Sequence, residues 1–233
     1  MTLRGWRRRA EHLPELMDDP ACDPAGLERT YRAFGTINAL IAGWRRVYTR
    51  DLRPHLRVRG GGSVLDIGCG GGDVARQLAR WARRDSLTLH VTAIDTDARA
   101  IAHARTGAAT GVTYRHASSA ALRAQGQRFD VVVSNHVLHH LSAAELAALL
   151  DDTEALCTGV AVHGDIERHP LAYAAYRLVT PRLFPGSFIH VDGLRSIRRS
   201  YTAAELAAVA PPGWTARRQV PFRTLLTWRA PRD

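Results

Sequence analysis

The hydrophobic positions between residues 63 and 166 alternate between two periodicities. Short apolar runs, each the length of one strand, are separated by segments in which apolar residues recur every three or four positions, as on one face of a helix. The predicted strands are residues 64–67, 87–94, 112–114, 129–133 and 160–162. The predicted helices between them are residues 74–83, 98–105 and 142–157. Because strands that alternate with helices build a doubly wound parallel sheet, the pattern predicts an α/β fold.

The N-terminal part of the chain has a different pattern. Residues 1–26 are polar and irregular, whereas apolar residues at helical spacing predict one helix over residues 27–52, ended by Pro54. A run of glycines follows this helix. We therefore expect residues 1–59 to form a helical segment that packs on the core, and residues 60–233 to form the main domain.

The C-terminal part also departs from the alternation. We predict a helix over residues 169–180, followed by a proline-containing loop, and a short helix over residues 202–210 that a capping-box sequence opens. Residues 214–220 and 222–228 are two strand-like stretches with almost no residues between them. They predict an antiparallel hairpin at the end of the chain.

Composition narrows the choice of partner and compartment. The 233 residues carry a formal net charge of +10, and all 32 basic residues are arginines. Such a charge can indicate nucleic acid or a membrane, but the arginines are spread along the chain without a block of five or six, so we attribute most of it to composition. We find neither an apolar run of ~20 residues that could span a bilayer nor a secretory signal. Three widely spaced cysteines indicate a reduced compartment, so we expect a cytoplasmic protein.

A glycine-rich turn, residues 66–72 (DIGCGGG), follows the first predicted strand. Glycines there let a ligand approach the backbone closely, and ligands of doubly wound sheets bind at the carboxyl ends of the strands. A dinucleotide would place its pyrophosphate at this turn, where the Asp66 carboxylate would repel it. A ligand with an ammonium and a sulfonium group suits that carboxylate better, and S-adenosylmethionine (SAM) carries both.

The spacing of Asp66, Gly68, Gly70 and Gly72 resembles the first motif of class I SAM-dependent methyltransferases. The resemblance covers roughly residues 60–165. It implies a Rossmann-like methyltransferase fold, with SAM as cofactor and S-adenosylhomocysteine (SAH) as product.

Two further stretches carry the resemblance. Asp95 ends the second predicted strand, where the acid of the family holds the two ribose hydroxyls. Residues 129–135 and 136–141 are similar to the fourth-strand motif of the family and the loop after it. The cofactor-binding residues that we expect are Tyr31, Asp66, Gly68, Cys69, Gly70, Gly72, Asp95, Thr96, Ser118, Asn135 and His136.

The expected adenine site departs from the family. The family often has Gly-Asp at the end of the third strand, with the Asp reaching the adenine amino group, whereas Ala117 and Ser118 stand here. We expect the Ser118 hydroxyl or the neighbouring backbone to bind adenine instead. The helix that carries Tyr31 is similar to the segment before the core of ubiquinone and menaquinone methyltransferases, which makes Tyr31 a candidate cofactor contact.

Three histidines, His136, His139 and His140, follow the fourth predicted strand. Methyl transfer depends on proximity, and a hydroxyl acceptor also gains from a base, which an imidazole can supply near neutral pH. We expect His140 or His139 to be this base, oriented by Asp165 beyond the fifth strand. His136 and His140 could also ligate a metal together with Asp165 or His163, but three convincing ligands are lacking, so we expect no metal.

The segment of about residues 166–202 is expected to cover the acceptor. It combines aromatic and apolar residues with a few polar ones, as small-molecule sites do, and its arginines could hold an anionic oxygen. The candidate acceptor-binding residues are Tyr173, Tyr176, His190 and Arg195. Together with the resemblance, this predicts O-methylation of a phenolic, quinone-like or polyketide-derived small molecule by a monomer or homodimer.

Two other functions stay open. A nucleic-acid methyltransferase would use the positive charge, but residues 134–137 (SNHV) differ from the Asn/Asp-Pro-Pro-aromatic run of enzymes that methylate base amino groups, so a nucleic-acid partner is disfavoured. A dinucleotide-dependent oxidoreductase or a non-catalytic nucleotide-binding module would use the same turn, because Gly70, Gly72 and Ala75 satisfy a loose dinucleotide pattern.

Overall fold

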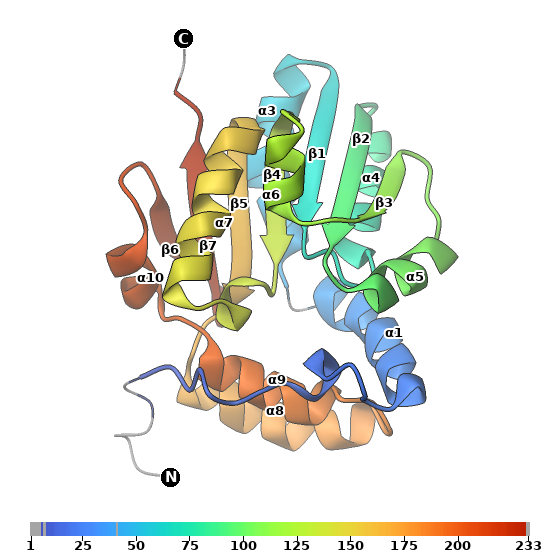
Figure 1. Ribbon diagram of the computed structural model, residues 1–233, viewed down its shortest axis with the longest axis vertical. Coiled ribbons are helices and arrows are strands. Elements are labelled where there is room, and N and C mark those ends of the chain that lie inside the picture. Colours follow the sequence, from blue (N-terminus) through green and yellow to red (C-terminus); the bar gives the residue numbers. More distant parts are fainter. Residues whose placement is uncertain (1–5, 7, 41, 232–233) are drawn as a thin grey trace.

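The computed structural model describes residue 6 and residues 8–40 and 42–231. Its centre is a seven-stranded sheet in the order β3-β2-β1-β4-β5-β7-β6 (Figure 1). The strands are β1 (Gly61–Ile67), β2 (Thr88–Asp95), β3 (Val112–His116), β4 (Phe129–Asn135), β5 (Cys157–Ile166), β6 (Thr215–Gln219) and β7 (Arg223–Arg229). β1 to β5 are parallel, and β7 pairs antiparallel with β5 and β6. The predicted doubly wound α/β sheet with a terminal hairpin is confirmed.

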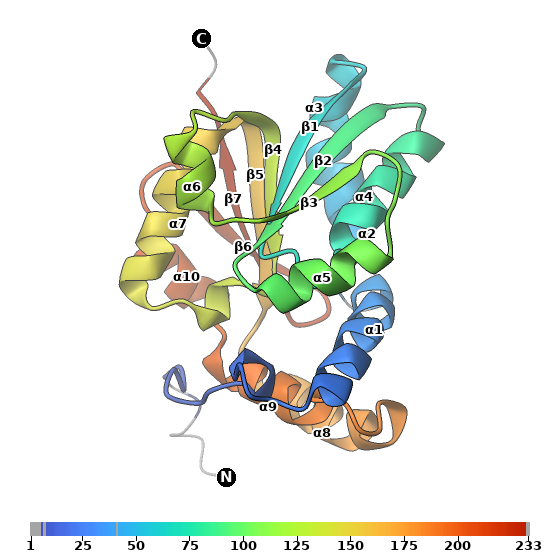
Figure 2. The same ribbon diagram turned by 45° about the vertical axis from the view of Figure 1, so that its right-hand side comes forward.

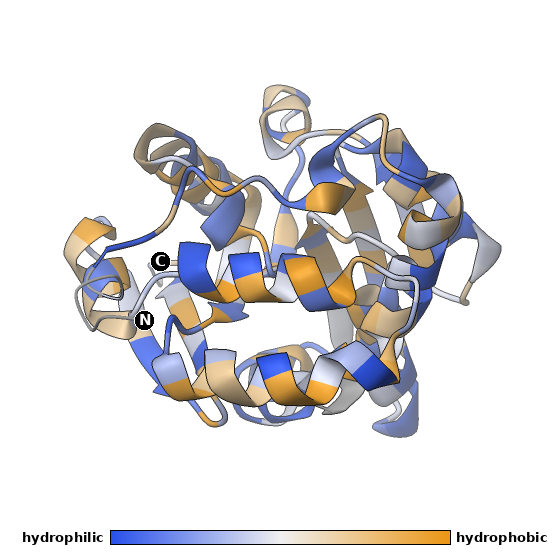
Figure 3. Cartoon of the chain, turned by 90° about the horizontal axis from the view of Figure 1, so that it is seen from below, coloured by the Kyte–Doolittle hydropathy of each residue, from blue (hydrophilic) through white to orange (hydrophobic). Residues whose placement is uncertain are grey.

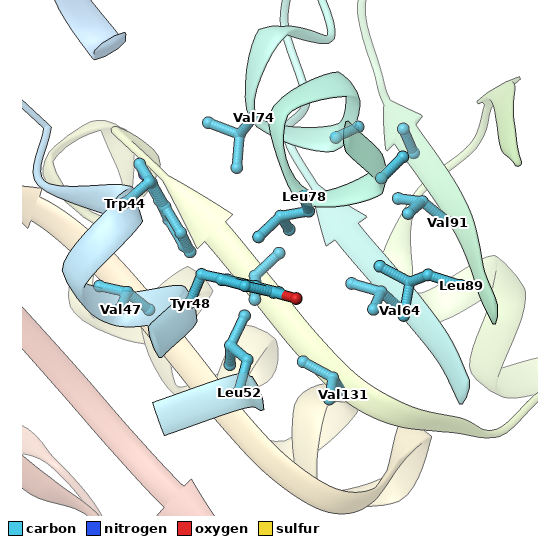
Figure 4. Packing of buried hydrophobic residues seen from close by; sticks show 14 of the residues in the cluster. Trp44, Val47, Tyr48, Leu52, Val64, Val74, Leu78, Leu89, Val91 and Val131 are labelled. Atoms are coloured by element: carbon cyan, nitrogen blue, oxygen red, sulfur yellow. The ribbon is translucent and has the colours of Figure 1, made fainter. Parts of the chain in front are cut away.

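Helices cover both faces of the sheet because successive residues of a strand point to opposite sides. On one face, Val64 of β1 belongs to a buried cluster with residues of α4 (Asp73–Arg84) and α5 (Ala98–Thr106). Figure 4 shows Leu78 of α4 in this layer, beside Trp44 and Tyr48. On the other face, the next residue, Leu65, packs with α6 (Ser119–Ala124), α7 (Ala143–Leu156) and α10 (Ala203–Val209).

The prediction of a single helix over residues 27–52 is wrong. Several short elements stand in its place: α1 (Pro24–Leu40), α2 (Trp44–Val47), the π-helical η3 (Tyr48–Leu52) and α3 (Arg53–Val58). The break falls at Gly43, whose φ of +67° is left-handed and interrupts a helix. Pro54 does not end the helical stretch, because α2, η3 and α3 follow one another without a gap and Pro54 is the second residue of α3.

Two helices cross the carboxyl ends of the parallel strands, together with α1 (Figure 2). α8 (Pro170–Leu183) is longer than predicted and contains Pro181 in its last turn, and α9 (Ile189–Arg199) was predicted only as a covering segment. In the view from below, α8 and α9 each carry both hydrophobic and hydrophilic residues (Figure 3). No helix in the described ranges is both long and apolar enough to cross a membrane.

The N-terminal segment (residues 8–19) runs along α9. The Ala10 amide donates to Arg198 O at 3.0 Å, and the Leu16 and Met17 amides donate to the Asp192 carboxylate at 2.7 and 3.0 Å. α9 thereby places residues 8–19 against the carboxyl ends of the strands, although the sequence of these residues gives no periodic pattern.

Candidate active site

A cavity of about 490 Å³ lies between the carboxyl ends of the strands and the layer of α1, α9 and the N-terminal segment. The strand order reverses between β1 and β4, where doubly wound sheets bind their ligands. The predicted site residues in the cavity wall are Tyr31, Asp66, Gly68, Cys69, Gly70, Asp95, Thr96, Asn135, His136, His139 and His140. The sequence therefore located eleven of the 26 residues of this wall.

The glycine turn after β1 is left-handed at each glycine of the motif. Gly68, Gly70 and Gly72 have φ of +67°, +51° and +77°. A Cβ atom on Gly68 would lie 2.5 Å from Val137 Cγ2, and one on Gly72 would lie 2.5 Å from a Tyr114 ring carbon. Gly72 precedes α4 and does not line the cavity. Its left-handed backbone connects the turn to the first residue of that helix.

Asp66 presents a buried carboxylate to the cavity. Its Oδ2 atom has no hydrogen-bond partner, and burial, followed by the charges of Asp73 and Asp95, raises its pKa well above the usual range. Asp73 begins α4, also lines the cavity, and accepts a hydrogen bond from Asn38 Nδ2 at 2.9 Å. This concentration of carboxylates favours a cationic ligand beside the turn.

Asp95 ends β2 at the neighbouring edge of the cavity. Its carboxylate accepts hydrogen bonds from the Gly70 amide at 2.8 Å and the Asp97 amide at 2.9 Å. These bonds hold the two oxygens beside the glycine turn, where paired hydroxyl donors could reach them. Tyr31 of α1 lines the same side and stacks on His103, with 5.0 Å between ring centroids.

Asn135 and His136 are both held by Arg223 of β7. Arg223 donates to Asn135 Oδ1 at 2.5 Å and meets His136 Nε2 at 2.8 Å. Burial lowers the pKa of Arg223 to about 10, so the guanidinium stays charged at neutral pH. Burial, and then Arg223, hold the pKa of His136 well below its usual range. His136 is therefore neutral and accepts from Arg223, which leaves its Nε2 unable to act as a base.

His139 lies between two carboxylates. Its Nδ1 atom is 2.7 Å from Asp165 Oδ1, and its Nε2 atom is 3.3 Å from Glu15 Oε1, within ion-pair range but without a hydrogen bond. Burial lowers the pKa of His139, but Asp165 and Glu15 outweigh it and raise the pKa to about 9. Burial likewise opposes the ionisation of Glu15, but His139 lowers its pKa to about 2.

His140 lies nearer the mouth of the cavity and is partly exposed. Its Nδ1 atom is 3.3 Å from Asp18 Oδ2, and its Nε2 atom is 3.8 Å from Glu15 Oε2. The structure thus pairs Asp165 with His139, and Asp18 with His140. The predicted orienting residue, Asp165, lies behind His139 and does not itself line the cavity.

The remaining predicted residues lie outside the cavity wall. Ser118 caps α6 by accepting from the Ala121 amide at 3.2 Å. The four predicted acceptor residues contact either other residues of 166–202 or the N-terminal part of the chain. The pairs are Tyr173 with Trp6, Tyr176 with Ile189, His190 with Thr180, and Arg195 with Pro14. None of these four residues lines the cavity.

Several wall residues escaped the sequence reasoning. Asp73 follows the glycine motif directly and could have been found there, because an acid in the first turn of a helix is a recognisable signal. Glu15, Asn38 and Ser196 reach the cavity from distant segments, and no local pattern marks them.

Comparison with known proteins agrees with this geometry. A family model for a methyltransferase domain matches residues 64–159. An uncharacterised methyltransferase of Mycobacterium tuberculosis is 30% identical over 189 residues, which are 72% of this chain and 87% of that protein. A ubiquinone biosynthesis O-methyltransferase of Roseobacter denitrificans is 37% identical over 114 residues, but the match spans only 47% of this chain and 43% of that relative.

Solved structures show the same fold. The plantazolicin methyltransferase BpumL, in complex with SAH, has a TM-score of 0.62 at 12% identity and covers 89% of this chain and 95% of its own. Human N-acetylserotonin methyltransferase, in complex with SAM, has a TM-score of 0.61 at 12% identity, with coverages of 90% and 57%. The topology, the glycine turn with its acids, and the full-length mycobacterial relative together lead to one conclusion: the chain belongs to the class I SAM-dependent methyltransferases.

Proposed function

We propose that this enzyme transfers the methyl group of SAM to an oxygen atom of a small phenolic, quinone-like or polyketide-derived acceptor. The observation that carries the proposal is the buried Asp66 carboxylate, whose Oδ2 atom lacks a partner beside a left-handed glycine turn. An unpaired buried carboxylate is costly unless a cation arrives, and SAM brings an ammonium and a sulfonium group. The ubiquinone O-methyltransferase among the relatives supports an oxygen acceptor.

In this proposal the methyl donor, SAM, occupies the side of the cavity formed by the glycine-rich turn after β1, which we call the glycine side. Asp66 faces the ammonium group, the backbone of Gly68 and Gly70 follows the methionine part, and Asp95 accepts from the two ribose hydroxyls. Tyr31 and Thr96 flank the nucleoside. Ser118 lies outside the wall, so we assign the adenine contact to the backbone and apolar groups beside the cavity.

The acceptor occupies the side formed by the N-terminal segment and the loop after β4. Met17, Phe34 and Leu141 provide apolar contacts there, and His139 and His140 provide the polar end. We assign the acceptor's proton to His140, because Asp18 lies at its Nδ1 atom and its side chain lines the cavity and is partly exposed. As the O–H bond breaks, the oxygen forms a bond to the methyl carbon. In the same step the carbon–sulfur bond breaks with its electron pair moving to sulfur, which releases SAH.

A labelled-methyl assay tests this function. SAM with a labelled methyl group is offered with panels of phenols, quinols, carboxylic acids and RNA, and the product is analysed for the methylated atom. We expect transfer to a phenol or quinol oxygen. Transfer to RNA alone would contradict the small-molecule assignment, and a thermal shift with NAD but not with SAM would contradict the donor assignment, since a ligand at ~100 times its Kd stabilises by about 2.7 kcal/mol.

A further inference from the structure

Three metal-ligating side chains meet in the wall of the cavity, away from the glycine turn. Glu15 comes from the N-terminal segment, and His139 and His140 come from the loop after β4. One ligand atom of each lies within 4.8 Å of the other two. We propose that these side chains bind one divalent transition-metal ion of the zinc type.

The donor atoms suit such an ion. Two imidazole nitrogens and one carboxylate oxygen are a ligand set of catalytic zinc sites, whose fourth position stays open for water or substrate. Magnesium and calcium prefer oxygen ligands alone, so the two histidines select against them. Ligands ~2.1 Å from a tetrahedral ion stand about 3.4 Å apart. The Glu15 Oε1 atom lies 3.3 Å from His139 Nε2, and the other carboxylate oxygen, Oε2, lies 3.8 Å from His140 Nε2, and both distances are close to that value.

The ring nitrogen that His139 contributes to this group of three side chains is Nε2. Its Nε2 atom is buried and has no hydrogen-bond partner, and the side chain is only 1% exposed. Asp165 Oδ1 accepts from Nδ1 at 2.7 Å, so an ion that displaces the proton on Nε2 would find the lone pair of the resulting neutral imidazole at that atom. A carboxylate behind a histidine is the usual support of a metal-binding imidazole.

The other two ligands have comparable supports. Ser196 Oγ donates to Glu15 Oε1 at 2.7 Å, and Asp18 Oδ2 lies 3.3 Å from His140 Nδ1. Each proposed ligand residue therefore has a further side-chain contact that restricts its orientation. The sequence led us to expect no metal, because the third ligand, Glu15, lies in a segment without any pattern.

The charges around the cluster also favour a cation. The carboxylates of Glu15 and Asp165 are both buried against His139. Arg199 also lines the cavity, but its guanidinium donates to the backbone oxygens of His139, His140 and Leu13. An ion bound by the three ligands would neutralise the buried carboxylates without displacing this arginine.

The consequence for catalysis rests on the proposed function. With three protein ligands, the ion would keep one coordination position for the acceptor, and it would take over the task assigned above to His140. The acceptor's hydroxyl would bind there and lose its proton to solvent at the mouth, so that its oxygen attacks the methyl group. Acceptors with two neighbouring oxygens, such as catechols, would benefit most, since both oxygens could bind the ion.

Metal binding can be measured without any substrate. The full-length chain is freed of metal with a chelator, titrated with Zn²⁺ by calorimetry, and analysed for metal content after dialysis. We expect one tightly bound ion per chain. Replacing a supporting group typically costs ~10- to 100-fold in affinity, so Glu15→Gln and His140→Gln, which remove ligands, should each weaken binding by at least about 100-fold. His12→Gln, an exposed histidine of the same segment, is the matched control and should keep wild-type affinity.

Each outcome decides one of the two proposals. Wild-type protein that binds no stoichiometric Zn²⁺, or binds it equally well after both ligand substitutions, overturns the metal site. Calorimetry with SAM, run in parallel on metal-free protein, tests the donor site. Protein that binds SAM but not Zn²⁺ contradicts only this inference, whereas protein that binds Zn²⁺ but not SAM contradicts only the proposed function.

Discussion

Asp165 holds His139 at two points. Its Oδ2 atom accepts from the backbone amide of His139 at 2.8 Å, and its Oδ1 atom meets the ring Nδ1 at 2.7 Å. One bond fixes the loop after β4, and the other fixes the orientation of the ring. Asp165 therefore determines where His139 Nε2 points, although it does not line the cavity.

Asp165→Asn should lower the free energy of unfolding by about 3 kcal/mol, because breaking a buried ion pair leaves a charge without its partner. Urea denaturation at pH 7 measures the loss. Asp151→Asn is the matched control, since Asp151 is an exposed acid of α7, and it should change the free energy by less than about 0.5 kcal/mol. Equal losses in the two variants would contradict the structural importance of this contact.

Asp66→Asn should have opposite effects on the free enzyme and on SAM binding. The variant removes a buried charge whose Oδ2 atom lacks a partner, so the ligand-free protein should become more stable at neutral pH. Losing a hydrogen bond to a charged group should weaken SAM binding about 10- to 100-fold.

Thermal unfolding without ligand and calorimetry with SAM give these two numbers for Asp66→Asn. The raised pKa in the folded state means that the wild-type carboxylate becomes protonated as pH falls, so the stability difference should shrink toward acid pH. Unchanged SAM affinity would refute the role of Asp66.

Gly68→Ala should destabilise the fold by about 1–2 kcal/mol, which is the cost of a left-handed backbone for an L-residue, and the contact with Val137 should add to it. Gly35→Ala is the control from the middle of α1, where a Cβ atom would meet nothing within 4 Å. Because alanine is the better helix former, this control should stabilise by up to about 1 kcal/mol. Denaturant midpoints that shift in the same direction for both variants would show that the left-handed backbone at Gly68 carries no such cost.

His163 should make the protein less stable in mild acid. It is buried between Ser134 and Thr153, and burial lowers its pKa from 6.5 to about 4. The unfolded chain therefore binds a proton below pH 6.5 that the folded chain refuses, so stability falls between about pH 6.5 and 4. At about 1.4 kcal/mol per pKa unit, the loss approaches about 3 kcal/mol.

Denaturation of the wild type and of His163→Asn at a series of pH values isolates this contribution. The variant should lose less stability than the wild type over the same interval, because it lacks the titrating ring. Parallel curves for the two proteins would show that His163 does not titrate in this way.

The sequence predicted the parallel sheet and the glycine side of the cavity because both depend on local patterns. Short apolar runs located the strands, and Asp66 and Asp95 lie at strand ends, so their positions followed from the strands. The opposite side of the cavity depends on tertiary contacts. Glu15 reaches His139 only because the Asp192 carboxylate of α9 binds the amides of Leu16 and Met17.

The errors have identifiable causes. The apolar periodicity over residues 27–52 continued through Gly43, whose left-handed backbone breaks the helix, and a pattern of hydrophobic residues does not reveal that φ value. The acceptor residues were chosen for aromatic and polar character within the cover. Tyr176 satisfies its hydroxyl on the backbone of Ile189 instead, which a sequence cannot show.

The N-terminal segment and α9 interlock through several bonds, including those from Arg195 to Pro14 O, from Arg199 to Leu13 O and from the Ala10 amide to Arg198 O. The N-terminal segment and α9, which lie far apart in the sequence, thus form one unit that covers the proposed SAM site. Exchange of either stretch alone with a relative would break these bonds on one side. Under the proposed assignment of the acceptor side, chimaeras that aim to change acceptor preference must therefore transplant both segments together.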